Sequence, residues 1–170
     1  MRIGILRETH PGERRVALTP DDVSRLARHE IGVVVEAGAG TAAGFADRGY
    51  RDKGAEVVDG ADGVTDGADA LVCVRLPSAT ADPRAGIERI GGNRILVGLG
   101  DPLGAAKAID GLAESGAAVF ALELLPRITR AQAMDVLSSQ ALAAGYKAVL
   151  MAADRLPRLF SMEMTAAGTL

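Results

Sequence analysis

The sequence predicts an α/β protein of the Rossmann or flavodoxin-like class, in which helices cover both faces of a mostly parallel sheet. Short β-branched runs alternate with longer, alanine-rich amphipathic segments along the chain. Strands that alternate with helices need crossover connections, and these make neighbouring strands parallel. The strand candidates are nearly continuous apolar runs, as expected for strands covered on both sides. A chain of 170 residues can bury roughly 70% of its unfolded surface, so this core needs no disulfide or metal.

The expected elements follow in chain order from this alternation. The predicted strands are residues 3–6, 33–36, 56–58, 70–75, 95–99 and 118–122. The predicted helices are residues 20–29, 46–53, 82–89, 104–115 and 130–154. The first helix has a clear start, because Thr19 is a good N-cap, Pro20 fits the first helical position, and two aspartates follow at the positive helix end.

The last predicted helix is unusual in composition. Thr129 to Gln132 has the T-x-x-Q pattern of a capping box, and Pro157 ends the helical pattern. Alanine occupies so many of its positions that another backbone can approach closely. We therefore expect this helix to pack tightly on a neighbour outside the first domain.

Composition excludes several classes of function. The net charge is -3 and there is no Trp, so neither a basic surface nor an aromatic stacking platform for nucleic acid is expected. One cysteine and two histidines are too few for a zinc cluster. The N-terminus lacks the apolar stretch of a signal peptide, and no run reaches the roughly 18 apolar residues of a membrane helix. We expect a cytoplasmic protein that reaches a membrane only through partners.

The glycines do not form a dinucleotide-binding fingerprint. Gly38, Gly40 and Gly44 follow the second predicted strand with the spacing G-x-G-x-x-x-G, whereas the fingerprint is G-x-G-x-x-G. A tight turn between strand and helix is favoured over a phosphate loop. Gly98 and Gly100 precede an Asp-Pro pair that suits a turn.

The most informative segment lies at the start of the last predicted helix. Gln132, Asp135 and Ser138 or Ser139 recur every three or four residues, so they are expected to share one helix face. Arg127 lies just upstream. Together these groups could hold a carboxamide and a ribose while the guanidinium reaches a phosphate. The alternative is structural, with Gln132 as the capping-box partner and Asp135 as a solvated acid.

Elsewhere the structural interpretation is favoured. Glu13, Arg14 and Arg15 are predicted to form a solvated charged loop. Cys73 alternates with valines and is predicted to be a small core residue.

Several motifs resemble the alanine dehydrogenase and nicotinamide nucleotide transhydrogenase family. They are MRIGILRET, RRVALTP, VVVEAGAG, PRITRAQAMDVLSSQALAAGYKAVLMAA and MTAAGT. The stretch 127–146, with MTAAGT at the end, is similar to the transhydrogenase alpha subunit in particular. The resemblance implies an NAD(H)-binding component, peripheral to the membrane. Hydride would pass from NADH to NADP+ on another domain, and a membrane component would couple this transfer to proton translocation.

The resemblance also implies roles for particular residues. Arg127, Gln132 and Asp135 would form the catalytic and cofactor-binding group, with Ser138 as a further cofactor-binding residue at the nicotinamide end. Their role would be positioning, because the cofactors carry out hydride transfer themselves. Family members dimerise, so a homodimer is expected.

Two departures argue against amino-acid oxidation. Arg15 matches the arginine that alanine dehydrogenases use for the substrate carboxylate. However, Cys73 stands at the lysine of the family's K-V-x-x-P stretch, and Asp101 stands where alanine dehydrogenases have a catalytic histidine. In alanine dehydrogenases the lysine and the histidine polarise the substrate carbonyl and move protons. Their replacement here argues against amino-acid oxidation.

The resemblance finally predicts the domain organisation. Residues 1–126 would form the N-terminal α/β domain, and residues 127–170 would hold the bridging helix toward an NAD-binding domain that this chain lacks. A stand-alone assembly or binding module of the same ancestry is the alternative, and an amino-acid dehydrogenase is less favoured.

Overall fold

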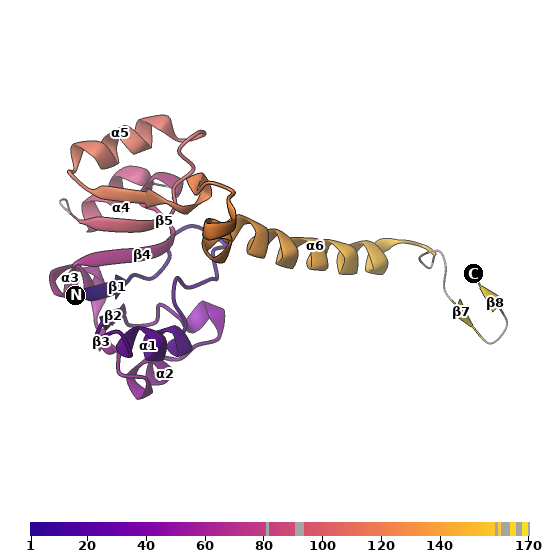
Figure 1. Ribbon diagram of the computed structural model, residues 1–170, viewed down its shortest axis with the longest axis horizontal. Helices are drawn as coiled ribbons and strands as arrows, with labels where there is room; N and C mark the ends of the chain where they lie inside the picture. The colour runs from indigo at the N-terminus through magenta and orange to yellow at the C-terminus, as the bar shows by residue number, and fades with distance from the viewer. Residues whose placement is uncertain (81, 91–93, 159, 161–163, 166–167, 170) are drawn as a thin grey trace. The chain divides into compact units, whose positions relative to one another are not determined.

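The computed structural model contains two compact units, Met1–Leu125 and Pro126–Leu170. It describes residues 1–80, 82–90, 94–158, 160, 164–165 and 168–169. The first unit holds the sheet and the second holds the long helix (Figure 1).

The first unit is built on a six-stranded parallel sheet. Its strands are β1 (Arg2–Ile5), β2 (Gly32–Glu36), β3 (Glu56–Val58), β4 (Ala70–Arg75), β5 (Ile95–Leu99) and β6 (Ala118–Ala121). They lie in the order β3-β2-β1-β4-β5-β6, and every neighbouring pair is parallel. The order reverses between β1 and β4, so the predicted doubly wound sheet is confirmed, with each strand within a residue of its expected position.

Among the described residues of the first unit, five α-helices and three short 3-10 helices accompany these strands. The α-helices are α1 (Pro20–Ala27), α2 (Asp47–Asp52), α3 (Gly60–Gly67), α4 (Pro83–Ile90) and α5 (Ala106–Glu114). The 3-10 helices are η1 (Thr41–Ala43), η2 (Pro77–Ala79) and η3 (Leu122–Leu124). Helix α3 was not predicted, because its sequence GADGVTDG is typical of turns. Burial of Val64 stabilises it despite that low propensity.

Two hydrophobic cores lie on opposite faces of the sheet. One core joins β4 and β5 to helices α3, α4 and α5, through side chains such as Leu71, Leu96 and Leu112. The other joins β1 and β2 to α1 and α2, and it includes Ile5 and Tyr50. The predicted helices on both faces are therefore present.

The start of α1 follows the predicted pattern. The backbone N–H of Thr19 donates to the Asp22 carboxylate at 2.9 Å, and its hydroxyl donates to the same oxygen at 2.7 Å. Pro20 occupies the first helical position. These contacts satisfy polar groups that a helix end leaves unpaired.

The glycine-rich segment after β2 forms a turn. Gly38 has a φ of 79°, and its N–H donates to the Asp47 carboxylate at 2.8 Å. A Cβ on Gly40 would lie 2.7 Å from the Tyr50 ring. These positions need glycine for local geometry and packing, as the interpretation as a tight turn predicts.

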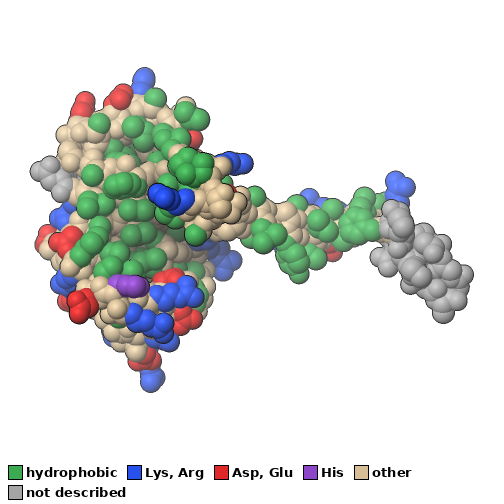
Figure 2. All heavy atoms as spheres, viewed as in Figure 1, with side chains coloured by type: hydrophobic (Ala, Val, Ile, Leu, Met, Phe, Trp, Pro, Cys, Tyr) green, Lys and Arg blue, Asp and Glu red, His purple; other side chains and the backbone are tan. Residues whose placement is uncertain are grey.

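Strands β4, β5 and β6 are covered unequally on their two faces within Met1–Leu125. Residues that face α3 to α5, such as Leu71 and Leu96, are fully buried. On the opposite face Ile95 is 38% and Phe120 is 59% exposed. Figure 2 shows hydrophobic side chains gathered over this part of the first unit. The expectation that these strands are buried on both sides is wrong for this half of the sheet.

The second unit contains η4 (Thr129–Met134), α6 (Val136–Arg155), β7 (Met164–Thr165) and β8 (Gly168–Thr169). Strands β7 and β8 pair antiparallel, Met164 opposite Thr169. The predicted capping box at Thr129 to Gln132 is wrong, because those residues form η4 and the α-helix begins later. Asp135 caps α6 instead, accepting a hydrogen bond from the Ser138 N–H at 2.9 Å.

Helix α6, which the structure describes along its whole length, is apolar but has no buried residue. It is long and apolar enough to cross a membrane by length and composition, so the expectation that no segment qualifies is wrong on these two criteria. Lys147 lies near its middle, however, and a charge there is costly in hydrocarbon.

Candidate cofactor-positioning site

The predicted polar residues of the second unit surround the first turn of α6. Asp135 and Ser138 are in direct contact: the Ser138 N–H donates to Oδ1 at 2.9 Å and its hydroxyl donates to Oδ2 at 2.6 Å. Ser139 turns back instead, and its hydroxyl donates to the Val136 carbonyl at 3.1 Å. Of the two serines that the spacing allowed, Ser138 is the one that joins Asp135.

Gln132 and Arg127 lie near Asp135 and Ser138 but belong to other parts of the chain, before α6 begins. Gln132 belongs to η4, and its carbonyl accepts the Asp135 N–H at 3.2 Å. The predicted shared face on one α-helix is therefore wrong for Gln132, because the α-helix starts only after Asp135. The side chains of Gln132 and Arg127 are exposed.

The charge of this cluster is fixed by its own contacts. The Ser138 hydroxyl and N–H lower the pKa of Asp135, with a smaller contribution from the nearby Arg127 guanidinium. Asp135 is therefore a carboxylate at neutral pH, a strong acceptor for an amide or a hydroxyl. The neighbouring exposed guanidinium and amide add donors. Such a set of donors and acceptors can bind amide, hydroxyl and phosphate groups.

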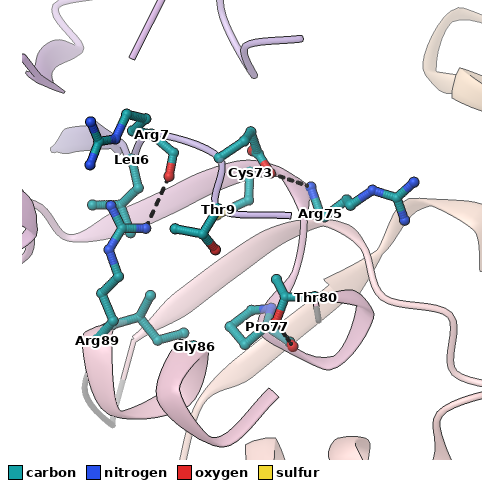
Figure 3. Close-up of a pocket in the computed structure, with 11 residues that line it drawn as sticks. Leu6, Arg7, Thr9, Cys73, Arg75, Pro77, Thr80, Gly86 and Arg89 are labelled. Carbon is teal, nitrogen blue, oxygen red and sulfur yellow. Dashed lines mark hydrogen bonds between the residues drawn. The ribbon is translucent and has the colours of Figure 1, made fainter. Parts of the chain in front are cut away.

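A second candidate region lies at the carboxyl ends of β1 and β4, where ligands bind in doubly wound sheets. The structure has a pocket there (Figure 3), with Arg89 at one side, Thr80 at the other and Thr9 between them. Arg89 is paired within the protein, because it binds the Glu36 carboxylate and donates to the Arg7 carbonyl at 3.0 Å. The charge of Arg89 is therefore compensated within the protein.

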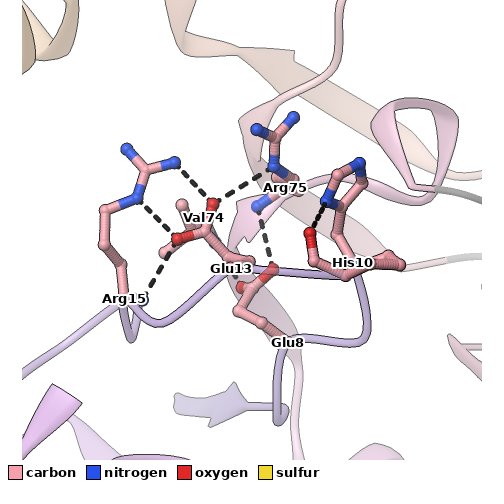
Figure 4. Close-up of polar contacts among 7 residues, drawn as sticks. Glu8, His10, Glu13, Arg15, Val74 and Arg75 are labelled. Carbon is pink, nitrogen blue, oxygen red and sulfur yellow. Dashed lines mark hydrogen bonds and ion pairs between the residues drawn. The ribbon is translucent and has the colours of Figure 1, made fainter. Parts of the chain in front are cut away.

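Beside this pocket lies a network of ion pairs that was not predicted from the sequence (Figure 4). The Glu13 carboxylate accepts hydrogen bonds from Arg15, at 2.7 Å from Nε and 2.6 Å from the terminal nitrogen, and from Arg75 Nε at 3.1 Å. Glu8 accepts the backbone N–H groups of Val74 and Arg75 at 2.7 and 3.2 Å. The prediction of a solvated loop is wrong for Glu13, whose side chain is only 5% exposed.

These contacts shift the ionisation of the buried groups. The bonds from Arg15 lower the pKa of Glu13 to about 2. Burial raises the pKa of Glu8 despite its two backbone donors. Burial also raises the pKa of the Cys73 thiol to about 12, so this cysteine is a protonated core residue, as predicted. The Glu-x-Arg spacing was an available signal for the Glu13–Arg15 pair, but no spacing linked Glu8 or Glu13 to Arg75.

Asp101 lies on the loop after β5 in a left-handed conformation, with a φ of 47°. The N–H groups of Gly100 and Asp101 both donate to Glu123 Oε1, at 2.7 and 2.6 Å. The carboxylate therefore fixes a strained loop in place. The Asp101 side chain is exposed at this edge of the sheet.

These features define a class of protein: a doubly wound α/β domain followed in the chain by an apolar helix whose start carries a polar cluster. The family described as "Alanine dehydrogenase/PNT, N-terminal domain" matches residues 4–144. The chain belongs to this family.

Transhydrogenase subunits are among the most similar relatives. The chain is 42% identical to "NAD(P) transhydrogenase subunit alpha" of Cereibacter sphaeroides over 168 residues, which covers 99% of the chain and 31% of that protein. It is 37% identical to the first of the polypeptides that make up the NAD(P) transhydrogenase alpha subunit of Rhodospirillum rubrum. That match spans 169 residues, 99% of the chain and 44% of the relative.

Solved structures agree with this grouping. A transhydrogenase from Sinorhizobium meliloti superposes with a TM-score of 0.86 at 43% identity, over 100% of this chain and 49% of that one. An L-alanine dehydrogenase superposes with a TM-score of 0.80 at 23% identity, over 99% and 46%, which shows the shared fold alone. The chain spans less than half the length of each of these proteins.

Proposed function

We propose that this chain is the N-terminal part of the NAD(H)-binding alpha subunit of a proton-translocating transhydrogenase. In the complete enzyme, hydride passes from NADH to NADP+ and the transfer is coupled to proton movement. The observation that carries the proposal is the Asp135–Ser138 cluster at the start of α6. It combines an ionised acceptor with exposed amide and guanidinium donors, in a chain aligned along almost its whole length with transhydrogenase alpha subunits.

The residues of this cluster would hold the nicotinamide end of NAD(H), which supplies the hydride. Asp135 would accept hydrogen bonds from the carboxamide or a ribose hydroxyl. The Ser138 hydroxyl would keep the Asp135 carboxylate oriented. The Gln132 amide would hydrogen-bond to the same carboxamide or ribose hydroxyl, and the Arg127 guanidinium would bind phosphate. Positioning is what the protein contributes, because hydride transfer between two nicotinamides needs no protein acid or base.

The adenosine and pyrophosphate would bind elsewhere. The glycine turn at residues 38–44 is closed by Asp47 and Tyr50, so it offers no phosphate loop. We place that part of the NAD(H) site in an NAD-binding domain outside residues 1–170, and NADP(H) on a separate partner domain. By itself the chain would bind NADH weakly and be inactive.

The proposed partners imply where in the cell the subunit would lie. The subunit would lie on the cytoplasmic side, peripheral to the membrane, held there by the NADP-binding and membrane components of the enzyme. A homodimer would give the exposed apolar side chains of α6 a protein surface to contact. The domain boundary at residue 126 belongs to the same proposal, with residues 127–170 as the bridge.

The test uses a chimera in which the portion of the Rhodospirillum rubrum subunit beyond the matched region follows Leu170. Hydride transfer from NADH to NADP+ is measured with the NADP-binding component of that enzyme. We expect Asp135→Ala and Arg127→Ala each to lower the rate about 10- to 100-fold, since a hydrogen bond to a charged group contributes about 1.5–3 kcal/mol. Arg130→Ala and Ser139→Ala are the matched controls.

Unchanged rates in both variants would remove these residues from the site. Circular dichroism and thermal unfolding of each variant separate loss of function from loss of folding. A chimera that folds and binds NADH but transfers no hydride would favour the second candidate, a non-catalytic assembly module of the same ancestry.

A further inference from the structure

Helices α4 and α5 lie side by side on one face of the sheet and form a groove between them (Figure 1). We call it the α4–α5 groove, and its volume is about 580 Å³. Its apolar lining consists of Pro83, Ile87 and Ala108, all half-buried, and Ile87 also packs on the hydrophobic core. The groove can therefore receive an apolar side chain from solvent.

The rim of the α4–α5 groove is acidic. Asp82, Glu88 and Glu114 expose their carboxyl groups there, and Lys107 is the basic side chain among its lining residues. Glu88 lies in the last turn of α4 and Glu114 is the last residue of α5. A helix dipole disfavours an anion at these positions. Helix stability therefore does not explain why acidic residues occupy them.

The acidity extends along the chain on both sides of the groove. Residues 60–125 contain nine Asp or Glu and five Lys or Arg, a net charge of -4 in a chain whose total is -3. Arg75 and Arg89 form ion pairs within the protein, and Arg94 donates to a backbone carbonyl. Among the side chains that the structure describes in this stretch, Lys107 is the one exposed basic group, against eight exposed acidic groups. This surface attracts cationic partners and repels anionic ones.

We propose that the α4–α5 groove is the docking site for a basic segment of the membrane component, with an apolar side chain between the helices and Lys or Arg on either side. This inference rests on the proposed function, in which the subunit is peripheral to the membrane. Cytoplasmic loops of membrane proteins carry an excess of Lys and Arg, which complements the acidic rim. Anionic lipid headgroups attract basic surfaces, so this face favours a protein partner over the lipid surface.

The geometry also specifies the segment. Both helices connect parallel strands of one sheet, so they run in the same direction, and the acidic groups lie at both ends of the groove. Asp82 precedes α4 and Glu88 follows six positions later, a rise of about 9 Å along the helix. An extended chain covers that distance in about three residues. The segment therefore needs two basic residues about three positions apart, with an apolar residue between them.

The experiment measures binding of the chimera described above to phosphatidylcholine vesicles that contain the membrane component of the Rhodospirillum rubrum enzyme. Glu88→Lys with Glu114→Lys reverses the charge of the rim. Asp62→Lys with Asp66→Lys makes the same change of charge on the exposed side of α3 and is the matched control. We expect the rim variant to bind at least tenfold more weakly and the control less than threefold more weakly, at low salt where charges are least screened.

Both variants are expected to fold, because a lysine near the end of a helix suits the helix dipole; circular dichroism checks this. Equal weakening in the two variants would overturn the proposal, since the general charge of the surface would then hold the partner. Unchanged binding of the rim variant, or no binding by the unaltered chimera, would also overturn it. Binding of the unaltered chimera to protein-free vesicles of phosphatidylglycerol would identify a lipid surface as the partner instead.

Hydride transfer with the isolated NADP-binding component is measured without a membrane, so the two proposals can fail separately. Binding that depends on the rim, without hydride transfer, would retain this inference while the proposed function fails. Hydride transfer together with binding that ignores the rim would have the opposite meaning.

Discussion

Glu13 offers the sharpest test of the ion-pair network at the edge of the sheet. Its carboxylate joins Arg15, two residues away in the loop after β1, to Arg75 at the end of β4. Replacing it by glutamine keeps the size of the side chain and removes the charge. Both arginines would then lose their anionic partner.

The magnitude follows from the pKa. A carboxyl lowered from 4.5 to about 2 favours the charged form in the folded protein by about 3 kcal/mol. The Arg15 and Arg75 side chains are 39% and 35% exposed, so water screens part of this interaction. We therefore expect Glu13→Gln to lower the free energy of unfolding at pH 7 by about 1–3 kcal/mol.

The pH dependence has a defined sign. Because the pKa is lower in the folded state, the contribution of Glu13 is fully present above pH 4.5 and is lost as the pH falls toward 2. The difference between wild type and Glu13→Gln should shrink through this window. Urea unfolding between pH 7 and pH 3, followed by circular dichroism, measures it.

The control is Glu114→Gln, which changes an exposed carboxylate on α5. We expect it to alter the free energy of unfolding by less than about 0.5 kcal/mol, as is usual for surface substitutions. If Glu13→Gln behaves in the same way at pH 7, or if its effect does not depend on pH, the network does not stabilise the fold.

Three further predictions concern the core. Tyr50→Phe removes the 2.9 Å hydrogen bond from the buried Tyr50 hydroxyl to the Leu18 carbonyl. We expect it to lower the free energy of unfolding, measured by thermal unfolding, by about 1 kcal/mol. An unchanged free energy would mean that water replaces the hydroxyl. Cys73, whose pKa is raised to about 12, should resist alkylation at pH 8 until the protein is denatured, and rapid modification of the native protein would contradict its burial. Gly40→Ala places a methyl group 2.7 Å from the Tyr50 ring and should destabilise by about 1–3 kcal/mol, whereas Gly145→Ala, with open space around it, should leave stability unchanged or raise it.

The strands and most helices could be predicted because local pattern and tertiary packing agree. The β-branched runs at 33–36 and 95–99 became β2 and β5, and Thr19 with Asp22 started α1 as expected. Helix α3 could not be predicted, since its glycines and aspartates favour turns and only burial of Val64 against the sheet favours a helix. The exposed face of β4, β5 and β6 could not be predicted either, because an apolar strand has the same sequence pattern whether or not a helix covers it.

For the polar cluster, the sequence pattern predicted the contact between Asp135 and Ser138 better than the backbone geometry around it. Spacing brought Asp135 and Ser138 together correctly, because both belong to one helical turn. It failed for Gln132, since the T-x-x-Q pattern competes with Asp135 for the role of N-cap and Asp135 wins. The network of Glu8, Glu13 and Arg75 joins residues more than 60 positions apart, a distance over which spacing carries no information.

The same network bears on the choice between hydride transfer and amino-acid oxidation. Oxidising an amino acid requires a cation for the carboxylate and a group that moves protons near neutral pH. Arg15 is held by Glu13 at 2.6 and 2.7 Å, so its charge is already compensated. Cys73, at the lysine position, is buried and protonated, and Asp101 brings an exposed carboxylate where the related dehydrogenases use an imidazole. In these states, the three groups do not supply the free cation and the proton-moving group that amino-acid oxidation requires. They therefore favour the proposed role, in which the cluster at Asp135 would orient a nucleotide and leave the chemistry to the cofactor.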